Sequence, residues 1–468
     1  MCARRVENVR KGIDDTQSRW RHKARMSAPT PHIRLTHRRV LRIAWPIVLS
    51  NATVPLLGIL DTGVIGQMGQ AAPIGAVGVG AVILTAIYWI FGFLRMGTSG
   101  LAAQARGAGD TGEVAALLTR ALLIGAAGGV LVLLLHVPLF AGAFALAPAS
   151  AEVEALAGDY MAVRVWSAPA VIAMFSMTGW LIAMERTGAV LMIQLLMNGL
   201  NIALNLWFVL GLGWGVTGVA WATFIAEWVG LICAFALCRD AFRLPDWRNW
   251  ALVFDAVRLR RMASVNTDIL IRSALLEVVM LSFIFIGSDR GDVTLAANQV
   301  LVQFLHLSSY IMDGFAFAAE ALVGQAVGAR AAGAVRRASI LTSQWGVGGG
   351  IILALCFALF GGVAIDALAA SEAVREAGRT YLPWMVAVPI FGAAAWMLDG
   401  IFIGATRTRE MRNMMILSLA VYGVAVVLLV PPFGNHGLWA ALLVAFAARG
   451  ITLGLRYPAL ERASQHSA

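Results

Sequence analysis

The sequence predicts an all-α integral membrane protein with twelve transmembrane helices arranged in two six-helix bundles. Three observations lead to this prediction: the composition, the recurrence of long apolar stretches, and an internal repeat. Hydrophobic residues make up 59% of the 468 residues, charged residues only 13%, and the mean hydropathy is +0.77. Because so few charged side chains cannot cover a water-soluble protein of this length, the chain belongs in a bilayer.

The apolar stretches have the length that a bilayer requires. A spanning helix needs about 20 mainly apolar residues, because the hydrocarbon core is about 30 Å thick and offers no water to the backbone. Such stretches are separated by short segments rich in charged residues, glycine or proline. We expect helices near residues 40–66, 74–97, 117–145, 161–184, 189–212, 216–238, 264–288, 294–318, 340–366, 381–404, 412–432 and 436–456.

The net charge of +10 comes from basic residues in the N-terminal region and in alternate loops. Six arginines lie within residues 239–261, and the loops 330–337 and 407–412 are also basic. Basic loops stay on the cytoplasmic side of a membrane, so this pattern predicts a multi-pass protein of the bacterial inner membrane with both termini in the cytoplasm. Because the charge is a topology signal and forms no single basic face, we expect no nucleic-acid partner.

An internal repeat appears when the chain is compared with itself at an offset of 221 residues. Gln104–Ala108 then aligns with Gln325–Ala329, and Arg186 aligns with Arg407. Six spans per unit give both units the same orientation, which predicts a pseudo-two-fold axis along the membrane normal. Parallel repeats of this kind are typical of transporters, with the substrate path at the interface of the lobes. The same offset also matches Tyr160 with Tyr381, Gly179 with Gly400, Ile182 with Ile403, and Thr187 with Thr408.

The repeat divides the chain into expected parts. A basic cytoplasmic extension, which lacks the apolar core of a signal peptide, is followed by a first lobe, an interlobe linker, a second lobe and a short tail. The translation start is either Met1 or Met26. The expected ranges are residues 1–33, 34–238, 239–261, 262–458 and 459–468.

Asp61 is the most distinctive intramembrane residue of the first lobe. An ionisable side chain in hydrocarbon costs at least about 2.5 kcal/mol, so it needs a partner, a water-filled cavity or a function. No basic residue lies within two helical turns of Asp61, and we expect it to take up a proton near neutral pH. Pro46 and Pro55 remove backbone hydrogen bonds from the same helix and predict a bend there. The alternative is that Asp61 only binds a neighbouring helix.

Two further spans of the first lobe carry polar side chains on shared faces. Asn198, Asn201 and Asn205 have the spacing of one helical face. Thr223 lies in the next span, with Glu227 one turn beyond it on the same face. These groups either ligate a coupling ion or form hydrogen bonds between helices.

The second lobe contains acidic residues of two kinds. Asp268 and Arg272 are four residues apart, so we expect them to form a structural ion pair. Glu320 falls near a helix end, where we expect it to be solvated. Asp313 and Asp399 have no basic residue nearby in the sequence and are expected to line a water-filled cavity.

Several segments together resemble the MATE (multidrug and toxic compound extrusion) transporters, in particular their DinF-like branch. The resemblance implies twelve helices in two bundles around a cleft. It also implies export of drugs or metabolites driven by proton or sodium influx. The segments that carry it are Trp45–Gly66, Phe93–Ala108, Asp313–Ala326, Leu398–Thr406 and Gly434–Gly437.

The resemblance also implies the coupling site. Asp61 would be the first-lobe coupling carboxylate, joined by Asn201, Asn205 and Thr223. This sequence departs from the branch at Asn205, where an aspartate is common, and an amide neither takes up a proton nor gives a cation a formal charge. Asp61 is therefore expected to be the sole titrating group of the first-lobe site.

In the second lobe, Asp399 matches an acid implicated in some family members, and Glu277 and Asp313 are further candidates. We expect no cofactor and no metal centre, with H⁺ or Na⁺ as the coupling ion and Asp61 or Asp399 as the place where Na⁺ would bind. The expected partners are small drug or metabolite substrates and the lipid bilayer, and the expected state is a monomer.

Two other functions fit parts of the pattern. A lipid-linked precursor flippase shares the architecture, but it needs many cationic residues along the cleft, and Arg272 is the one arginine that the sequence places clearly inside a span. A membrane-embedded transferase needs clustered aspartates or a histidine-rich motif. The sequence has no such cluster, and its seven histidines are dispersed.

Overall fold

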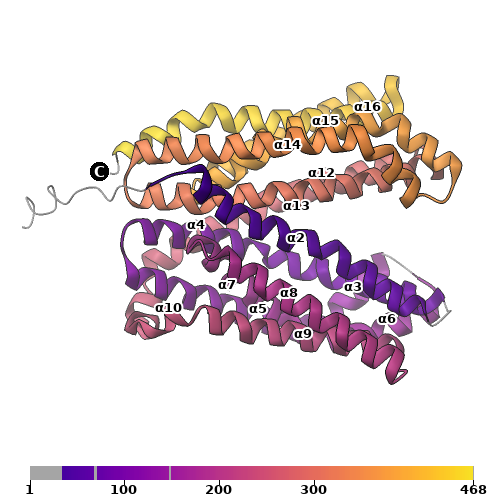
Figure 1. Ribbon diagram of the computed structural model, residues 1–468, viewed down its shortest axis with the longest axis horizontal. Helices are drawn as coiled ribbons and strands as arrows, with labels where there is room; N and C mark the ends of the chain where they lie inside the picture. The colour runs from indigo at the N-terminus through magenta and orange to yellow at the C-terminus, as the bar shows by residue number, and fades with distance from the viewer. Residues whose placement is uncertain (1–33, 68–70, 147–148, 467–468) are drawn as a thin grey trace, which may run out of the picture. The chain divides into compact units, whose positions relative to one another are not determined.

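The computed structural model of the chain describes residues 34–67, 71–146 and 149–466. The predicted N-terminal extension, residues 1–33, lies outside these ranges. All regular elements in the described ranges are helices, which form two bundles within Leu35–Ala468. Figure 1 shows the first bundle in indigo to magenta and the second in orange to yellow.

The first bundle corresponds to the first predicted lobe. Short 3₁₀ segments interrupt two of its spans without ending them, and a π segment forms the end of a third span. Its elements are α2 (His37–Gly66), α3 (Ala71–Trp89), η1 (Ile90–Gly92), α4 (Phe93–Gly107), α5 (Thr111–Leu146), α6 (Ala151–Arg164), η2 (Val165–Ser167), α7 (Ala168–Ala183), α8 (Thr187–Asn205), η3 (Leu206–Gly211) and α9 (Gly215–Leu237).

The second bundle follows a connection that is itself partly helical. Its first long helix begins at Ala256, earlier than the predicted start near residue 264, because the Asp255 side chain caps it by accepting a hydrogen bond from Arg258 N (2.9 Å). The elements are α10 (Arg239–Arg243), η4 (Pro245–Arg248), α11 (Trp250–Val253), α12 (Ala256–Ser288), α13 (Asp292–Gly328), α14 (Ala332–Leu368), α15 (Glu372–Gly404) and α16 (Thr408–His466).

The helices account for the twelve predicted spans. Ten helical stretches of the described chain are long and apolar enough to cross a membrane. The last of them holds two helices, because Gly434 (φ 57°, ψ −129°) interrupts the helical geometry of α16. Helix α2 supplies the remaining span. Large apolar side chains such as Leu134 (74% exposed) and Val427 (71% exposed) face outward, which suits a lipid environment.

Equivalent positions of the two lobes make equivalent contacts, which confirms the parallel repeat. A Cβ added to Gly179 would lie 2.2 Å from the carbonyl oxygen of Arg95. A Cβ added to Gly400, 221 residues later, would lie 2.4 Å from that of Ala316, which follows Arg95 by the same offset. The same two helices therefore pack at the same point in each lobe.

The connections that carry most arginines lie together at one end of the bundles. We call this the arginine-rich end and define it by residues 106–113, 183–187, 239–261, 328–337 and 404–412. It lies toward the left in Figure 1, where α4, α10 and the last helix end. Side chains from four of these segments surround one cavity. An even number of spans in each lobe predicts that these connections lie on the same side of the membrane, and they do lie together.

Candidate functional site

The two lobes are joined at the arginine-rich end by a pair of symmetric hydrogen-bond sets. Gln104 of α4 donates to the last carbonyl oxygen of α15 (3.0 Å) and accepts from Arg261 Nη2 (2.7 Å). Gln325 of α13 donates to the last carbonyl oxygen of α7 (3.1 Å) and accepts from Arg39 Nη2 (2.9 Å). All four bonds cross between the lobes. We call Arg39, Gln104, Arg261 and Gln325 the interlobe seal.

Two glycines allow the seal to form. A Cβ at Gly107 would lie 2.0 Å from the carbonyl oxygen of Gln325, and a Cβ at Gly328 would lie 1.9 Å from that of Gln104. Any other residue would force α4 and α13 apart, because real Cβ contacts are much longer. The repeated Gln-Ala-x-Gly-Ala motif is thus the sequence signal of a closed interlobe contact.

The structure brings together three of the predicted first-lobe residues. Asn201 Nδ2 donates to Thr223 Oγ1 (2.8 Å), and Asn205 Nδ2 donates to Asn201 Oδ1 (2.9 Å). The Thr223 hydroxyl in turn donates to the Val219 carbonyl (3.0 Å). Both asparagines are 1% exposed. The set ties α8 to α9.

The remaining first-lobe predictions fall on α2, which packs along α8. Pro46 lies on this helix and is half-buried. Asp61 and Pro55 also belong to the helix, but their side chains lie outside the part of the chain that the structure describes. The contact between the two helices includes a hydrogen bond from Asn198 Nδ2 to Thr53 Oγ1 (2.9 Å).

The first lobe contains a buried ion pair that has no counterpart among the sequence-based predictions. Glu227 of α9 accepts a short hydrogen bond from Arg164 Nη1 of α6. The guanidinium lies 5.9 Å from the Tyr160 ring centroid, and the Arg164 carbonyl accepts from the Tyr88 hydroxyl (2.9 Å). Glu227 therefore pairs with Arg164 and does not belong to the hydrogen-bonded set around Thr223.

The predicted pair of Asp268 with Arg272 is wrong. Asp268 accepts from Arg412 Nη1 (2.6 Å), whereas Arg272 Nη1 lies 3.4 Å from Asp399 Oδ2. Arg449 Nη2 lies 3.8 Å from the same oxygen. Tertiary packing overrides the four-residue spacing, because α16 runs beside α12 and presents its own charges. Asp399 thus has basic partners that its neighbours in the sequence do not reveal.

The expectation that Glu320 is solvated is also wrong, since its side chain is 1% exposed. Arg95 Nη1 of α4 lies 3.4 Å from Glu320 Oε2 of α13, and the guanidinium lies over the Phe317 ring, 3.9 Å from its centroid. This ion pair crosses from the first lobe to the second within the membrane-spanning helices. Together with the seal, it holds the lobes to each other.

The other second-lobe candidates differ in their surroundings. Asp313 is half-buried and makes no hydrogen bond or ion pair to another described residue. The charges that act on it belong to Arg95, Glu320, Arg272 and Asp399. Glu277 is exposed on α12 and takes no part in this group.

We call Asp313, Glu320, Asp399, Arg95, Arg272 and Arg449 the central charge cluster. Its three carboxylates and three guanidiniums balance in formal charge. Asp399 Oδ1, Arg272 Nε and Arg449 Nε are buried without a hydrogen-bond partner among the described residues. Buried polar atoms of this kind call for an explanation, such as water, an ion or a functional rearrangement. Within the described chain, no group of three or more His, Cys, Asp or Glu side chains has the arrangement of a metal site.

Three of the arginines in these ion pairs could have been noticed from their positions in the sequence. Arg95 and Arg164 each fall near one end of a predicted span, and Arg449 falls inside the predicted span 436–456. Near a span end, an arginine is usually read as reaching the membrane surface. Their carboxylate partners lie 225, 63 and 50 residues away, so no local spacing reveals them.

Comparison with known proteins identifies the family. The MatE family model matches residues 46–207 and 269–429, one segment in each lobe. DNA damage-inducible protein F of Escherichia coli is 36% identical over 429 residues, which cover 88% of this chain and 90% of that protein. A probable multidrug resistance protein NorM of Pseudomonas aeruginosa is 26% identical, with coverage of 90% and 89%.

Solved structures agree on the fold. One, described as the outward-facing conformation of a multidrug resistance MATE family transporter of the MOP superfamily, matches with a TM-score of 0.83 and 19% identity, covering 91% of this chain and 96% of that one. A MOP superfamily transporter from Pyrococcus furiosus matches with a TM-score of 0.84 and 18% identity, covering 92% and 96%. With a family match in both lobes and a relative aligned over most of its length, the chain belongs to the MatE family of multidrug and toxic compound extrusion transporters.

Proposed function

We propose that this chain is a secondary active antiporter that exports small organic compounds, often cationic, in exchange for inward-moving H⁺ or Na⁺. Membership of the MatE family supports efflux, and the interlobe ion pair between Arg95 and Glu320 carries the proposal of coupling. A buried pair that joins the lobes makes their relative position depend on charge. An ion that binds more tightly in one arrangement of the lobes then changes the balance between the two conformations.

The proposed cycle uses the seal as the gate on the arginine-rich, cytoplasmic side. With the seal closed, Asp61 is reached from the periplasm, and binding of H⁺ or Na⁺ there weakens substrate binding and releases it. When the seal opens, the ion leaves and a new substrate binds. Asn201, Asn205 and Thr223 support the first-lobe site, and Asp399 is the candidate coupling acid of the second lobe. We expect the protein to work as a monomer in the bilayer.

Transport in everted membrane vesicles energised by respiration tests this proposal, with ethidium as the fluorescent reporter. We expect accumulation to collapse with the pH gradient, to be indifferent to Na⁺, and to be lost in Asp61→Asn but not in the control Asp292→Asn. Sodium-dependent transport that survives Asp61→Asn but not Asp399→Asn would move the coupling site to the second lobe. Gradient-driven export retained in both variants would disprove the proposed coupling.

The lipid-linked precursor flippase is less well supported. That function requires cationic side chains that are free to hold a polyanionic headgroup. The membrane-spanning helices do carry more arginines than expected, but Arg95, Arg164, Arg272 and Arg449 each lie beside a carboxylate. Charge balance within the helices therefore favours small-molecule efflux.

A further inference from the structure

The two halves of the interlobe seal differ in charge. The first half consists of Arg39 and Gln325, and the second half consists of Arg261 and Gln104. In the first half, Arg39 donates to both oxygens of Glu185 (2.6 and 2.9 Å), and Arg106 lies 3.6 Å from the same carboxylate. The equivalent position of the second half is Thr406, whose hydroxyl lies 3.4 Å from Arg261 Nη2. Glu185 and Thr406 share an unusual backbone conformation, with φ of 54° and 51°. Among the described residues, Arg261 therefore lacks the carboxylate that its counterpart Arg39 has.

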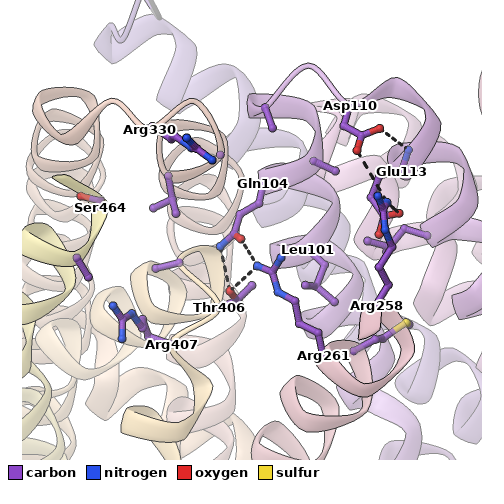
Figure 2. A pocket seen from close by; sticks show the side chains of 18 of the residues that line it. Leu101, Gln104, Asp110, Glu113, Arg258, Arg261, Arg330, Thr406, Arg407 and Ser464 are labelled. Atoms are coloured by element: carbon purple, nitrogen blue, oxygen red, sulfur yellow. Dashed lines mark hydrogen bonds and ion pairs between the residues drawn. The ribbon is translucent and has the colours of Figure 1, made fainter. Parts of the chain in front are cut away.

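A cavity of about 550 Å³ lies beside Thr406, at the place where the second half lacks an acid. Figure 2 shows Arg330 and Arg407 on one side of Gln104 and the acidic residues of the cavity on the other. Arg261 reaches toward Gln104 and Thr406 from a third direction. This volume lies within the range of sites that hold small polar ligands.

The acidic side of the cavity is already neutralised. Glu113 accepts from Arg120 (2.8 Å to each oxygen) and is also hydrogen-bonded by Arg258, which lies 3.8 Å from Asp110. Two carboxylates thus meet two guanidiniums. The excess positive charge of the cavity belongs to Arg261, Arg330 and Arg407. Among the described residues, only Arg407 of these three has an acidic partner, Glu410 (3.1 Å).

Arg330 adds an independent observation. It has φ of 55°, whereas the equivalent position of the first lobe is Gly109, with φ of 72°. A left-handed conformation is unfavourable for a residue other than glycine. Among the described residues, none accepts a hydrogen bond from the Arg330 guanidinium. A strained residue with an unpartnered charge, placed where the repeat has glycine, indicates a role outside the fold.

We propose that this cavity binds a phosphate-bearing anion, which takes the place of the carboxylate that the second half of the seal lacks. Arg261, Arg330 and Arg407 supply its positive ligands, since guanidinium groups bind phosphate through paired N–H donors. Two sources share this chemistry: the headgroup of an anionic lipid, for which basic pockets between membrane helices are suited, and a free phosphate compound of the cytoplasm. Because Gln104 of the first lobe borders the cavity, the anion stabilises the closed seal.

The full chain in nanodiscs provides the test, with thermal stability as the readout, since a ligand of the folded state raises Tm. One series uses phosphatidylcholine discs with added inorganic phosphate, and the other uses discs that contain phosphatidylglycerol. We expect a saturable rise of Tm in at least one series. Stabilisation by phosphate identifies a soluble ligand, and stabilisation by phosphatidylglycerol alone identifies the lipid headgroup.

Two variants separate the site from general effects. Arg330→Gly removes a ligand and relieves the strain, so it is expected to fold well and to bind the anion roughly tenfold to hundredfold more weakly. Thr406→Glu copies the first half, so it is expected to raise Tm without anion and to abolish the response. Arg337 lies on the exposed surface outside the cavity, so Arg337→Gln is the matched control and is expected to keep the Tm response to the anion. No rise of Tm in either series, or an unchanged response in both variants, would overturn the proposal.

Discussion

The ion pair between Arg95 and Glu320 gives a direct test of how charge holds the lobes together. Glu320→Gln keeps the shape of the side chain and removes its charge. Arg95 would then stay between the lobes over the Phe317 ring without a counter-charge. Leaving a buried charge unpaired costs about 3–5 kcal/mol, and we take the lower value because the Arg95 side chain is 13% exposed.

That cost falls on the closed arrangement, in which the pair is formed. A loss of about 3 kcal/mol changes the ratio of closed to open molecules by about 150-fold. Glu227→Gln is the matched control, because it breaks the buried pair with Arg164 inside the first lobe. The control is expected to lower the stability of the protein and to leave the ratio of the two conformations unchanged.

The ratio can be measured by double electron–electron resonance between two spin labels at the arginine-rich end. Thr111→Cys and Gly333→Cys place one label on each lobe, at exposed positions where α5 and α14 begin. The four native cysteines are first replaced by serine. Glu320→Gln is expected to shift the distance distribution toward longer values. If it leaves the distribution unchanged, or if Glu227→Gln shifts it equally, the interlobe pair does not control the conformation.

Two further outcomes concern the seal. Burial raises the pKa of Glu185, but the hydrogen bond and charge of Arg39 outweigh it and hold the pKa below its ordinary value of 4.5. The stabilisation is therefore complete above that value and lost as the pH falls through the lowered pKa. Glu185→Gln should lower the free energy of unfolding by roughly 1.5 kcal/mol at pH 7. It should also reduce the fall of Tm between about pH 7 and pH 3.5. An unchanged fall of Tm would show that another group titrates. Gly328→Ala should lower the free energy of unfolding by denaturant by roughly 1–3 kcal/mol, because its Cβ would lie 1.9 Å from the Gln104 carbonyl oxygen. The control Gly333→Ala has open space around it and should stay within about 0.5 kcal/mol of wild type. Equal effects of the two variants would mean that the close approach is not needed.

Much of the fold follows from the sequence, because bilayer thickness and the need to satisfy the backbone act on each segment separately. The apolar stretches located the spans, and the offset between Gln104 and Gln325 predicted two lobes of the same orientation. Element ends were less accurate. The polar start of α12 has no apolar signal, and only the cap by Asp255 shows that the helix begins at Ala256.

Residues that share one helix face were also placed well, since helical geometry fixes their neighbourhood. Asn201 and Asn205 do meet, and Thr223 joins them from the next helix. The role of Asp61 in ion coupling stays a prediction. It rests on the absence of basic neighbours in the sequence and on the family resemblance.

The spans, their orientation relative to one another and the repeat therefore follow from the sequence alone. The partner of each buried charge depends instead on how the helices pack. Asp399 meets Arg449 rather than a residue of its own helix, and Glu320 meets Arg95 of the other lobe. The physical reason is that a charge in a low-dielectric interior pairs with whichever opposite charge packing brings near, and that choice depends on contacts between helices far apart in the chain.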